Sequence, residues 1–135
     1  MTQTAGTSAS ANILAQVAMI KAFDDCYPWA EGFVKHLQKC RDYVYQRLSN
    51  MEKVKANFQE ATFVAFPDIS AVGVSSDEFV DICRNKYKLS LVPGNEKWFG
   101  PGAAGHVRIC YSTNLEVLKE GMDRFEACVN GLGGR

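Results

Sequence analysis

The residue with the clearest capacity for chemistry is Arg108, which lies in a short apolar segment directly after a glycine-rich loop. Val107 and Ile109 flank it, and this period of two sends successive side chains to opposite faces of a β-strand. If the valine and the isoleucine face a core, the guanidinium faces away from it. A guanidinium carries a rigid fork of N–H donors that matches a carboxylate, and each charge-assisted bond contributes about 1.5–3 kcal/mol. The pattern is therefore consistent with a carboxylate-binding site.

The loop before this strand, residues 93–105, is the second candidate feature. Trp98, Phe99 and Gly100 lie within it, and large apolar side chains on such a loop often close over a substrate or a partner domain. Four glycines would let the backbone approach a ligand closely: Gly94, Gly100, Gly102 and Gly105. A simpler interpretation stays open, because a strand arginine is usually solvated or in a surface ion pair worth about 0–1 kcal/mol. A loop rich in glycine and proline is usually only a turn.

Other reactive side chains do not form a convincing catalytic arrangement. The two histidines, His36 and His106, are far apart in the sequence, and we expect both to be structural. The adjacent Asp24 and Asp25 are more simply a helix terminus than an acid/base pair. Lys97 could be a desolvated amine for Schiff-base chemistry, but an exposed loop lysine is the simpler interpretation.

Composition restricts the class of protein. A chain of 135 residues is one domain long and can bury about two thirds of its unfolded surface. Fifteen basic and fifteen acidic residues cancel, so we expect neither nucleic acid nor an anionic membrane as a partner. Five scattered cysteines without a C-x-x-C pair indicate buried thiols in a reducing cytoplasm and no zinc site. With no apolar run of about 20 residues and no signal peptide, we expect a cytoplasmic protein.

Two helices are expected first. Asn12 is a suitable N-cap for a short helix that ends near Phe23, and its apolar residues lie on more than one face. Pro28 suits the first turn of a long helix to about Ser49, about 30 Å long. Apolar residues repeat along it at steps of three and four: Trp29, Phe33, Leu37, Cys40, Val44 and Leu48.

The remaining pattern predicts a two-layer α/β (α+β) domain, in which helices cover a small mixed sheet. Strands are expected at residues 54–58, 62–66 and 89–92 and around Arg108. Ser75 with Glu78 forms a capping box for one helix. Thr113 with Glu116 is expected to start the last helix, which the glycines from Gly131 onward end.

Four of these segments, in order and spacing, resemble the C-terminal part of class I/II pyridoxal-phosphate aminotransferases of the aspartate aminotransferase type (fold type I). They are residues 59–70 (QEATFVAFPDIS), 89–100 (LSLVPGNEKWFG), 105–113 (GHVRICYST) and 118–125 (LKEGMDRF). Residues 8–23 are similar to the family's segment just after its catalytic lysine region. The resemblance covers nearly the whole chain.

The resemblance implies a role for each part of the chain. Arg108 would be the arginine that binds the α-carboxylate of the amino acid or 2-oxo acid substrate. Residues 28–135 would be the small domain, including the long helix that links it to the large domain, and the loop 93–105 would move as that domain closes. Residues 1–27 would pack on the missing large domain. The family also implies a homodimer.

The resemblance also implies what this chain lacks. In the family, the large domain supplies the lysine that binds pyridoxal 5'-phosphate, the aspartate under the pyridine nitrogen and the phosphate-binding groups. No residue here matches them, since Lys21 and Lys97 lie outside the lysine motif. We therefore expect no catalytic or cofactor-binding residue in this fragment, no cofactor bound to it alone and no activity by itself.

Two local departures and two alternatives accompany the resemblance. Ala61 replaces a common glycine, Val64 replaces a common tyrosine, and the loop is longer than usual for the family. The chain could instead be a stand-alone binding or oligomerisation module, dimerising through Ile13, Val17 and Trp29. It could also be part of a split enzyme whose large domain is on another chain.

Overall fold

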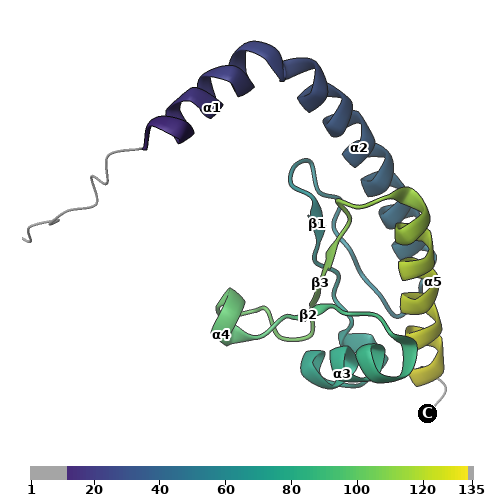
Figure 1. Cartoon of the computed structure of the whole chain (residues 1–135). Helices are drawn as coiled ribbons and strands as arrows, with labels where there is room; N and C mark the ends of the chain where they lie inside the picture. The colour runs from purple at the N-terminus through teal and green to yellow at the C-terminus, as the bar shows by residue number, and fades with distance from the viewer. Residues whose placement is uncertain (1–11, 134–135) are drawn as a thin grey trace, which may run out of the picture. The chain divides into compact units, whose positions relative to one another are not determined.

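The computed structural model describes residues 12–133, and its first two elements are helices (Figure 1). The first, α1, spans Ile13–Asp25, and the second, α2, spans Tyr27–Ser49. The Asn12 side chain accepts a hydrogen bond from the Ala15 N–H at 3.0 Å, so the predicted N-cap is confirmed. No residue of α1 is buried. Contacts divide the chain into two compact units within α2, and the second unit begins at His36.

The apolar stripe of α2 is buried only in its second half. The buried residues of the helix are Cys40, Val44, Tyr45 and Leu48. Trp29 and Phe33 stack on each other with ring centroids 5.3 Å apart, but both remain exposed. The long helix that the pattern predicted is confirmed. The pattern does not show which part of the apolar stripe packs against the core.

A three-stranded sheet in the order β1-β3-β2 forms the centre of the second unit. Its strands are β1 (Val64–Ala65), β2 (Val92–Pro93) and β3 (Val107–Cys110). Val64 pairs with Cys110, and Val92 pairs with Arg108. Both pairs are antiparallel, so the expectation of a mixed sheet is corrected: the central β3 runs opposite to both neighbours.

The predicted strands are longer than those that form. Residues 54–58 form no strand, and only Lys55 bridges to Asp68. Backbone hydrogen bonds nevertheless extend the pairing beyond β1, since Val107 N donates to the Pro67 carbonyl and Tyr111 N to the Phe63 carbonyl. Apolar and branched residues indicate which segments are extended. The hydrogen-bonded pairing of a strand, however, ends where the neighbouring strand ends.

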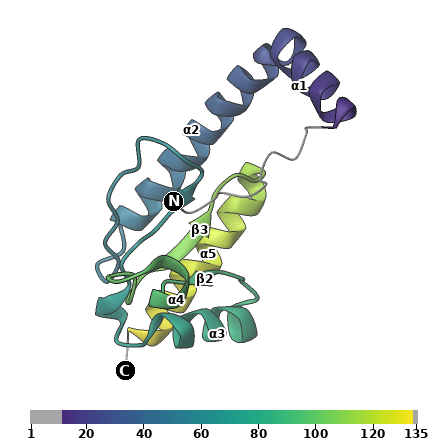
Figure 2. The ribbon, with the colours of Figure 1, turned by 90° about the vertical axis from the view of Figure 1, so that its left-hand side faces the viewer.

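Two helices complete the core on one side of the sheet: α3 (Ser76–Tyr87) and α5 (Leu115–Leu132). The Phe79 ring of α3 meets the Phe125 ring of α5 edge-on, with centroids 5.6 Å apart. Figure 2 shows α5 behind the sheet and beside the second half of α2. The α/β fold with a small sheet and covering helices is thus confirmed.

The predicted N-cap of α3 is confirmed, whereas that of α5 is not. Ser75 accepts from the Glu78 N–H, as the capping box predicted. At α5 the cap is Asn114, which accepts from the Glu116 N–H at 2.7 Å, and not Thr113. Thr113 instead donates its backbone N–H to the Tyr111 carbonyl in the turn before the helix. Within residues 12–133, no helix is both long and apolar enough to cross a membrane.

Candidate functional site

Arg108 faces away from the core, as its alternation with apolar residues predicted. Along β3, Val107 and Ile109 are buried, whereas Arg108 and Cys110 are exposed. Figure 1 shows the short helix α4, Glu96–Phe99, on the opposite side of the sheet from α5. The guanidinium therefore lies on the face of the sheet that the core helices leave open, which we call the outer face.

Three aromatic rings lie in a row beside Arg108 on the outer face. The guanidinium carbon lies 5.9 Å from the centroid of the Phe99 ring. Phe66 follows Ala65, the partner of Ile109, and so comes level with Arg108. Its ring centroid is 5.1 Å from that of Phe99 and 5.0 Å from that of His106, with which it stacks nearly parallel.

Arg108 differs from the other described arginines in having no anionic partner. Within residues 12–133, its guanidinium makes neither a hydrogen bond nor an ion pair. Each of the others is within 4 Å of a carboxylate: Arg41 of Asp42, Arg47 of Asp123 and Glu126, Arg84 of Asp81 and Arg124 of Glu120. The N–H donors of Arg108 are therefore open to solvent or to an external carboxylate. Of the two simpler interpretations, an ion pair within the described residues does not hold, whereas a solvated arginine fits the structure.

The loop carries one helical turn, which the sequence analysis did not predict. The side chain of Asn95 caps α4 by accepting from the Trp98 N–H at 3.2 Å, and Gly100, at φ +80°, ends it. Asn95, a suitable N-cap, was the one sequence signal for this turn. The four residues of α4 are too few to show a periodic apolar pattern. The helical turn gives the two adjacent aromatic residues different environments: the Phe99 ring packs on Phe66, whereas the Trp98 side chain is 72% exposed.

At two of the loop glycines, the close approach is between parts of the chain itself. Gly94 donates its N–H to the His106 carbonyl at 2.7 Å, and a Cβ at residue 94 would lie 2.6 Å from that same oxygen. Gly105 has φ +81°, and a Cβ there would collide with the Ser70 hydroxyl. These glycines shape the loop that carries α4, whatever the loop binds.

The histidines and lysines do not gather near Arg108 as a catalytic group. His36 Nε2 is 2.8 Å from the Thr113 carbonyl oxygen, and His106 Nδ1 is 3.2 Å from that of Ala104. Lys21 forms an exposed ion pair with Asp25 at 3.1 Å, and Lys97 is exposed on α4. No lysine in residues 12–133 is buried.

These residues do not fit a complete site for pyridoxal phosphate. Such a site requires a lysine in a desolvated setting and groups that bind the phosphate. In the described chain the lysines are exposed or half-buried. What the described residues offer is the unpaired guanidinium of Arg108.

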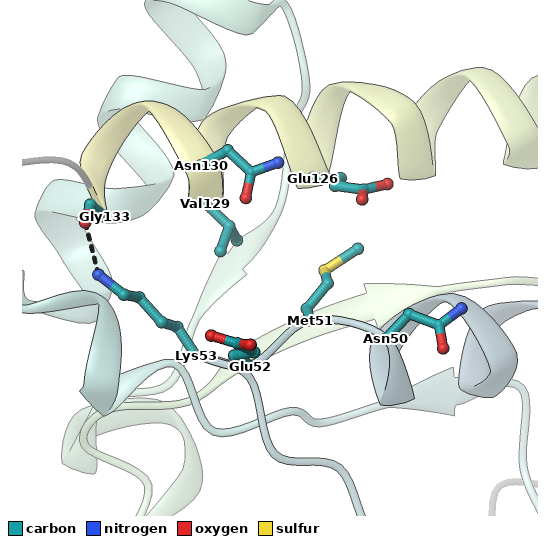
Figure 3. A pocket seen from close by; sticks show the side chains of 8 residues that line it. All are labelled: Asn50, Met51, Glu52, Lys53, Glu126, Val129, Asn130 and Gly133. Carbon is teal, nitrogen blue, oxygen red and sulfur yellow. Dashed lines mark hydrogen bonds between the residues drawn. The ribbon is translucent and has the colours of Figure 1, made fainter.

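A separate hollow lies between the C-terminal ends of α2 and α5 (Figure 3). Its volume is about 400 Å³, and Arg108 is not among its lining residues. Lys53 donates to the Gly133 carbonyl at 2.6 Å, as the dashed line in Figure 3 marks, and Glu126 is bound by Arg47. Lys53 and Glu126 therefore already have partners, and Glu52 is the one charged lining residue of the hollow without a partner in the described chain.

Comparison with known proteins assigns the family. The family described as Aminotransferase class I and II matches residues 1–125. The chain belongs to this family. An aspartate aminotransferase of Pyrococcus horikoshii is 35% identical over 118 residues, which are 86% of this chain and 30% of that protein. An aromatic-amino-acid aminotransferase of Thermococcus litoralis is 35% identical over 82% of this chain and 28% of its own length.

Solved structures agree with the aminotransferase family. A PLP-bound aminotransferase structure from Clostridium difficile 630, described as putative, has a TM-score of 0.80 and 30% identity, and it covers 88% of this chain. The match covers 30% of the C. difficile chain. The chain thus spans about a third of the length of the aminotransferases that it matches.

Proposed function

We propose that this chain is the C-terminal part of a pyridoxal-phosphate-dependent aminotransferase, in which Arg108 binds the α-carboxylate of the amino acid or 2-oxo acid substrate. The observation that carries the proposal is the guanidinium of Arg108. It lies on the outer face of the sheet with all its N–H donors free of partners within the described chain. Membership of the aminotransferase family supplies the substrate class, because amino acids and 2-oxo acids share this carboxylate.

The residues of this chain act by binding and positioning. Arg108 offers a planar fork of donors that suits a carboxylate in bidentate geometry, and a lysine cannot reproduce that fork. In this proposal, Trp98 and Phe99 on α4 would limit the access of water when the loop closes, and excluding water would strengthen the interaction of charges inside. Pyridoxal phosphate supplies the electron sink of the reaction when it is bound by the rest of the protein.

The proposed division of labour places the cofactor in a large domain outside this chain. The exposed apolar residues of α1 support it, since they need a partner surface: Ile13, Leu14, Val17, Met19, Ile20 and Phe23. The assembled protein is expected to be a cytoplasmic homodimer. Alone, the chain is expected to be inactive and to show no saturable, lysine-dependent absorbance band when mixed with pyridoxal phosphate.

The test replaces Arg108 in a protein that joins this chain to the large domain. Arg108→Lys keeps the charge and removes the fork, so KM for carboxylate substrates is expected to rise about 10- to 150-fold. Cofactor absorbance should stay nearly unchanged. Arg84→Lys is the matched control, because Arg84 is an exposed arginine on α3 that pairs with Asp81. Equal loss of substrate and cofactor binding in Arg108→Lys would show that the residue is structural.

The exposed apolar side chains of α1 and of the start of α2 also favour a second candidate function, a stand-alone binding or oligomerisation module. In that case Ile13, Val17 and Trp29 would form a dimer contact without catalysis. The coding DNA before Met1 separates the two: an in-frame large domain supports the aminotransferase, and a stop codon with a promoter supports the module. Activity that arises only on mixing with a separate large-domain chain would indicate a split enzyme.

A further inference from the structure

We propose that Phe99 is the positioning residue of Arg108: its ring holds one face of the guanidinium, so that the N–H edge stays turned toward a carboxylate. The inference rests on the proposed function of Arg108 as the carboxylate-binding group. It adds a physical link between that group and α4, because Phe99 is the last residue of α4. The loop and the arginine would then act as one unit.

The geometry suits this division between face and edge. The guanidinium carbon lies 5.9 Å from the centroid of the Phe99 ring, within the range in which a cation is attracted to an aromatic face. A guanidinium is planar, and its donors point outward in that plane. A ring on one face therefore occupies none of the donors, which have no other partner in residues 12–133.

The Phe99 ring itself packs against a second aromatic ring. Phe66, the residue after β1, packs against it with centroids 5.1 Å apart, and His106 stacks on Phe66 at 5.0 Å. Asn95 caps the turn that carries Phe99, and the Gly100 N–H closes it on the Glu96 carbonyl at 2.9 Å. Phe99 is 38% exposed, about half as much as Trp98, its neighbour on α4.

The consequence is that the guanidinium of Arg108 is ordered before a carboxylate binds. A free arginine side chain loses rotamer freedom when it binds, and this loss weakens binding. A ring that already restricts the guanidinium removes part of that cost. Removing the ring is therefore expected to weaken carboxylate binding by about two- to five-fold, the effect of an exposed cation–π contact.

The test uses nuclear magnetic resonance of the whole chain. The Nε–Hε signal of Arg108, identified by its loss in Arg108→Gln, reports the order of the guanidinium through its ¹⁵N relaxation. Titration with sodium pyruvate at constant ionic strength reports the binding of a 2-oxo acid. Phe99→Leu keeps an apolar contact with Phe66 and removes the ring, whereas Phe99→Tyr keeps the ring. Phe63→Leu is the matched control: Phe63 is an exposed phenylalanine beside β1 that makes no ring or cation contact within the described chain.

Phe99→Leu is expected to lower the order parameter of Arg108 Nε and to weaken pyruvate binding two- to five-fold, while Phe99→Tyr and Phe63→Leu match the parent chain. An order parameter unchanged in Phe99→Leu would overturn the positioning role, whatever pyruvate does. A different result would contradict the proposed function. If pyruvate still changes the chemical shifts of the Arg108→Gln protein, the carboxylate binds elsewhere. The two ideas can therefore fail separately.

Discussion

The guanidinium of Arg47 on α2 binds the carboxylate of Glu126 on α5, with 2.5 Å between Nη2 and Oε2. Asp123 lies 2.7 Å from the other terminal nitrogen, which also donates to the Tyr43 hydroxyl. The hydrogen bond to Glu126 is the largest of the causes that raise the pKa of Arg47. The pair therefore joins the second half of α2 to the last helix of the core.

We expect Arg47→Met to lower the free energy of unfolding by about 1 kcal/mol, because the pair is only partly shielded from solvent. The methionine keeps the apolar contact of the side-chain stem. Urea unfolding at low and high salt measures the loss, which should shrink at high salt. Arg84→Met, at an exposed pair within α3, is expected to cost less. An equal cost at both sites would contradict the link between helices.

Asp68 is expected to make stability depend on pH. Its carboxylate accepts a hydrogen bond from the Ser70 N–H at 2.8 Å, and hydrogen bonds from the side chain and backbone of Ser70 lower its pKa. A carboxyl with a lowered folded pKa stabilises the fold fully above its unfolded pKa of about 3.9. That contribution is lost as pH falls through the lower, folded value.

The variant Asp68→Asn should therefore be less stable than the parent chain near neutral pH, with the difference disappearing as pH falls below about 4. Urea unfolding at a series of pH values measures it. Glu60→Gln removes an exposed carboxylate without a partner in the described chain and should track the parent more closely. A difference that is constant with pH would rule out the titration of Asp68 as its cause.

The glycines of the chain are expected to respond to alanine with opposite signs. Gly94→Ala places a Cβ 2.6 Å from the His106 carbonyl oxygen, so the loop must shift, and we expect a loss of about 1–3 kcal/mol. Gly121 lies inside α5, where a Cβ meets only Leu89 at an ordinary 3.8 Å. Gly121→Ala should stabilise by about 0.5–1 kcal/mol. Thermal unfolding of the two variants decides, and equal effects would contradict the packing of the loop.

The thiols should divide into two classes of reactivity. Cys26 and Cys110 are exposed, whereas Cys40, Cys83 and Cys128 are buried. Burial raises the pKa of Cys40, which lowers the reactive thiolate fraction further. With iodoacetamide under native conditions, mass spectrometry should find two fast labels and three that require unfolding. A third fast label would show that part of the core opens readily.

The sequence predicted features that depend on neighbouring residues in the chain. The alternation around Arg108 placed its side chain on the open face, and Asn12 and Ser75 capped their helices as expected. These features are set within a few residues by backbone geometry and local hydrogen bonds. They require no knowledge of the rest of the fold.

Features that depend on distant contacts were not predictable in the same way. Thr113 and Asn114 are both suitable caps, and the turn to Tyr111 decides between them. The row of rings beside Arg108 requires β1, β3 and α4 to meet in one register, which no local pattern encodes. The direction of the strands also came only from the structure.

The absence of buried residues in α1 has a practical consequence for work on this protein. An isolated helix of thirteen residues is only marginally stable in water. Its exposed apolar surface favours aggregation at the protein concentrations that crystallisation needs. Every buried apolar side chain of the described chain lies at Cys40 or beyond. A shortened version that starts near His36 would keep that interior intact and give better-behaved samples.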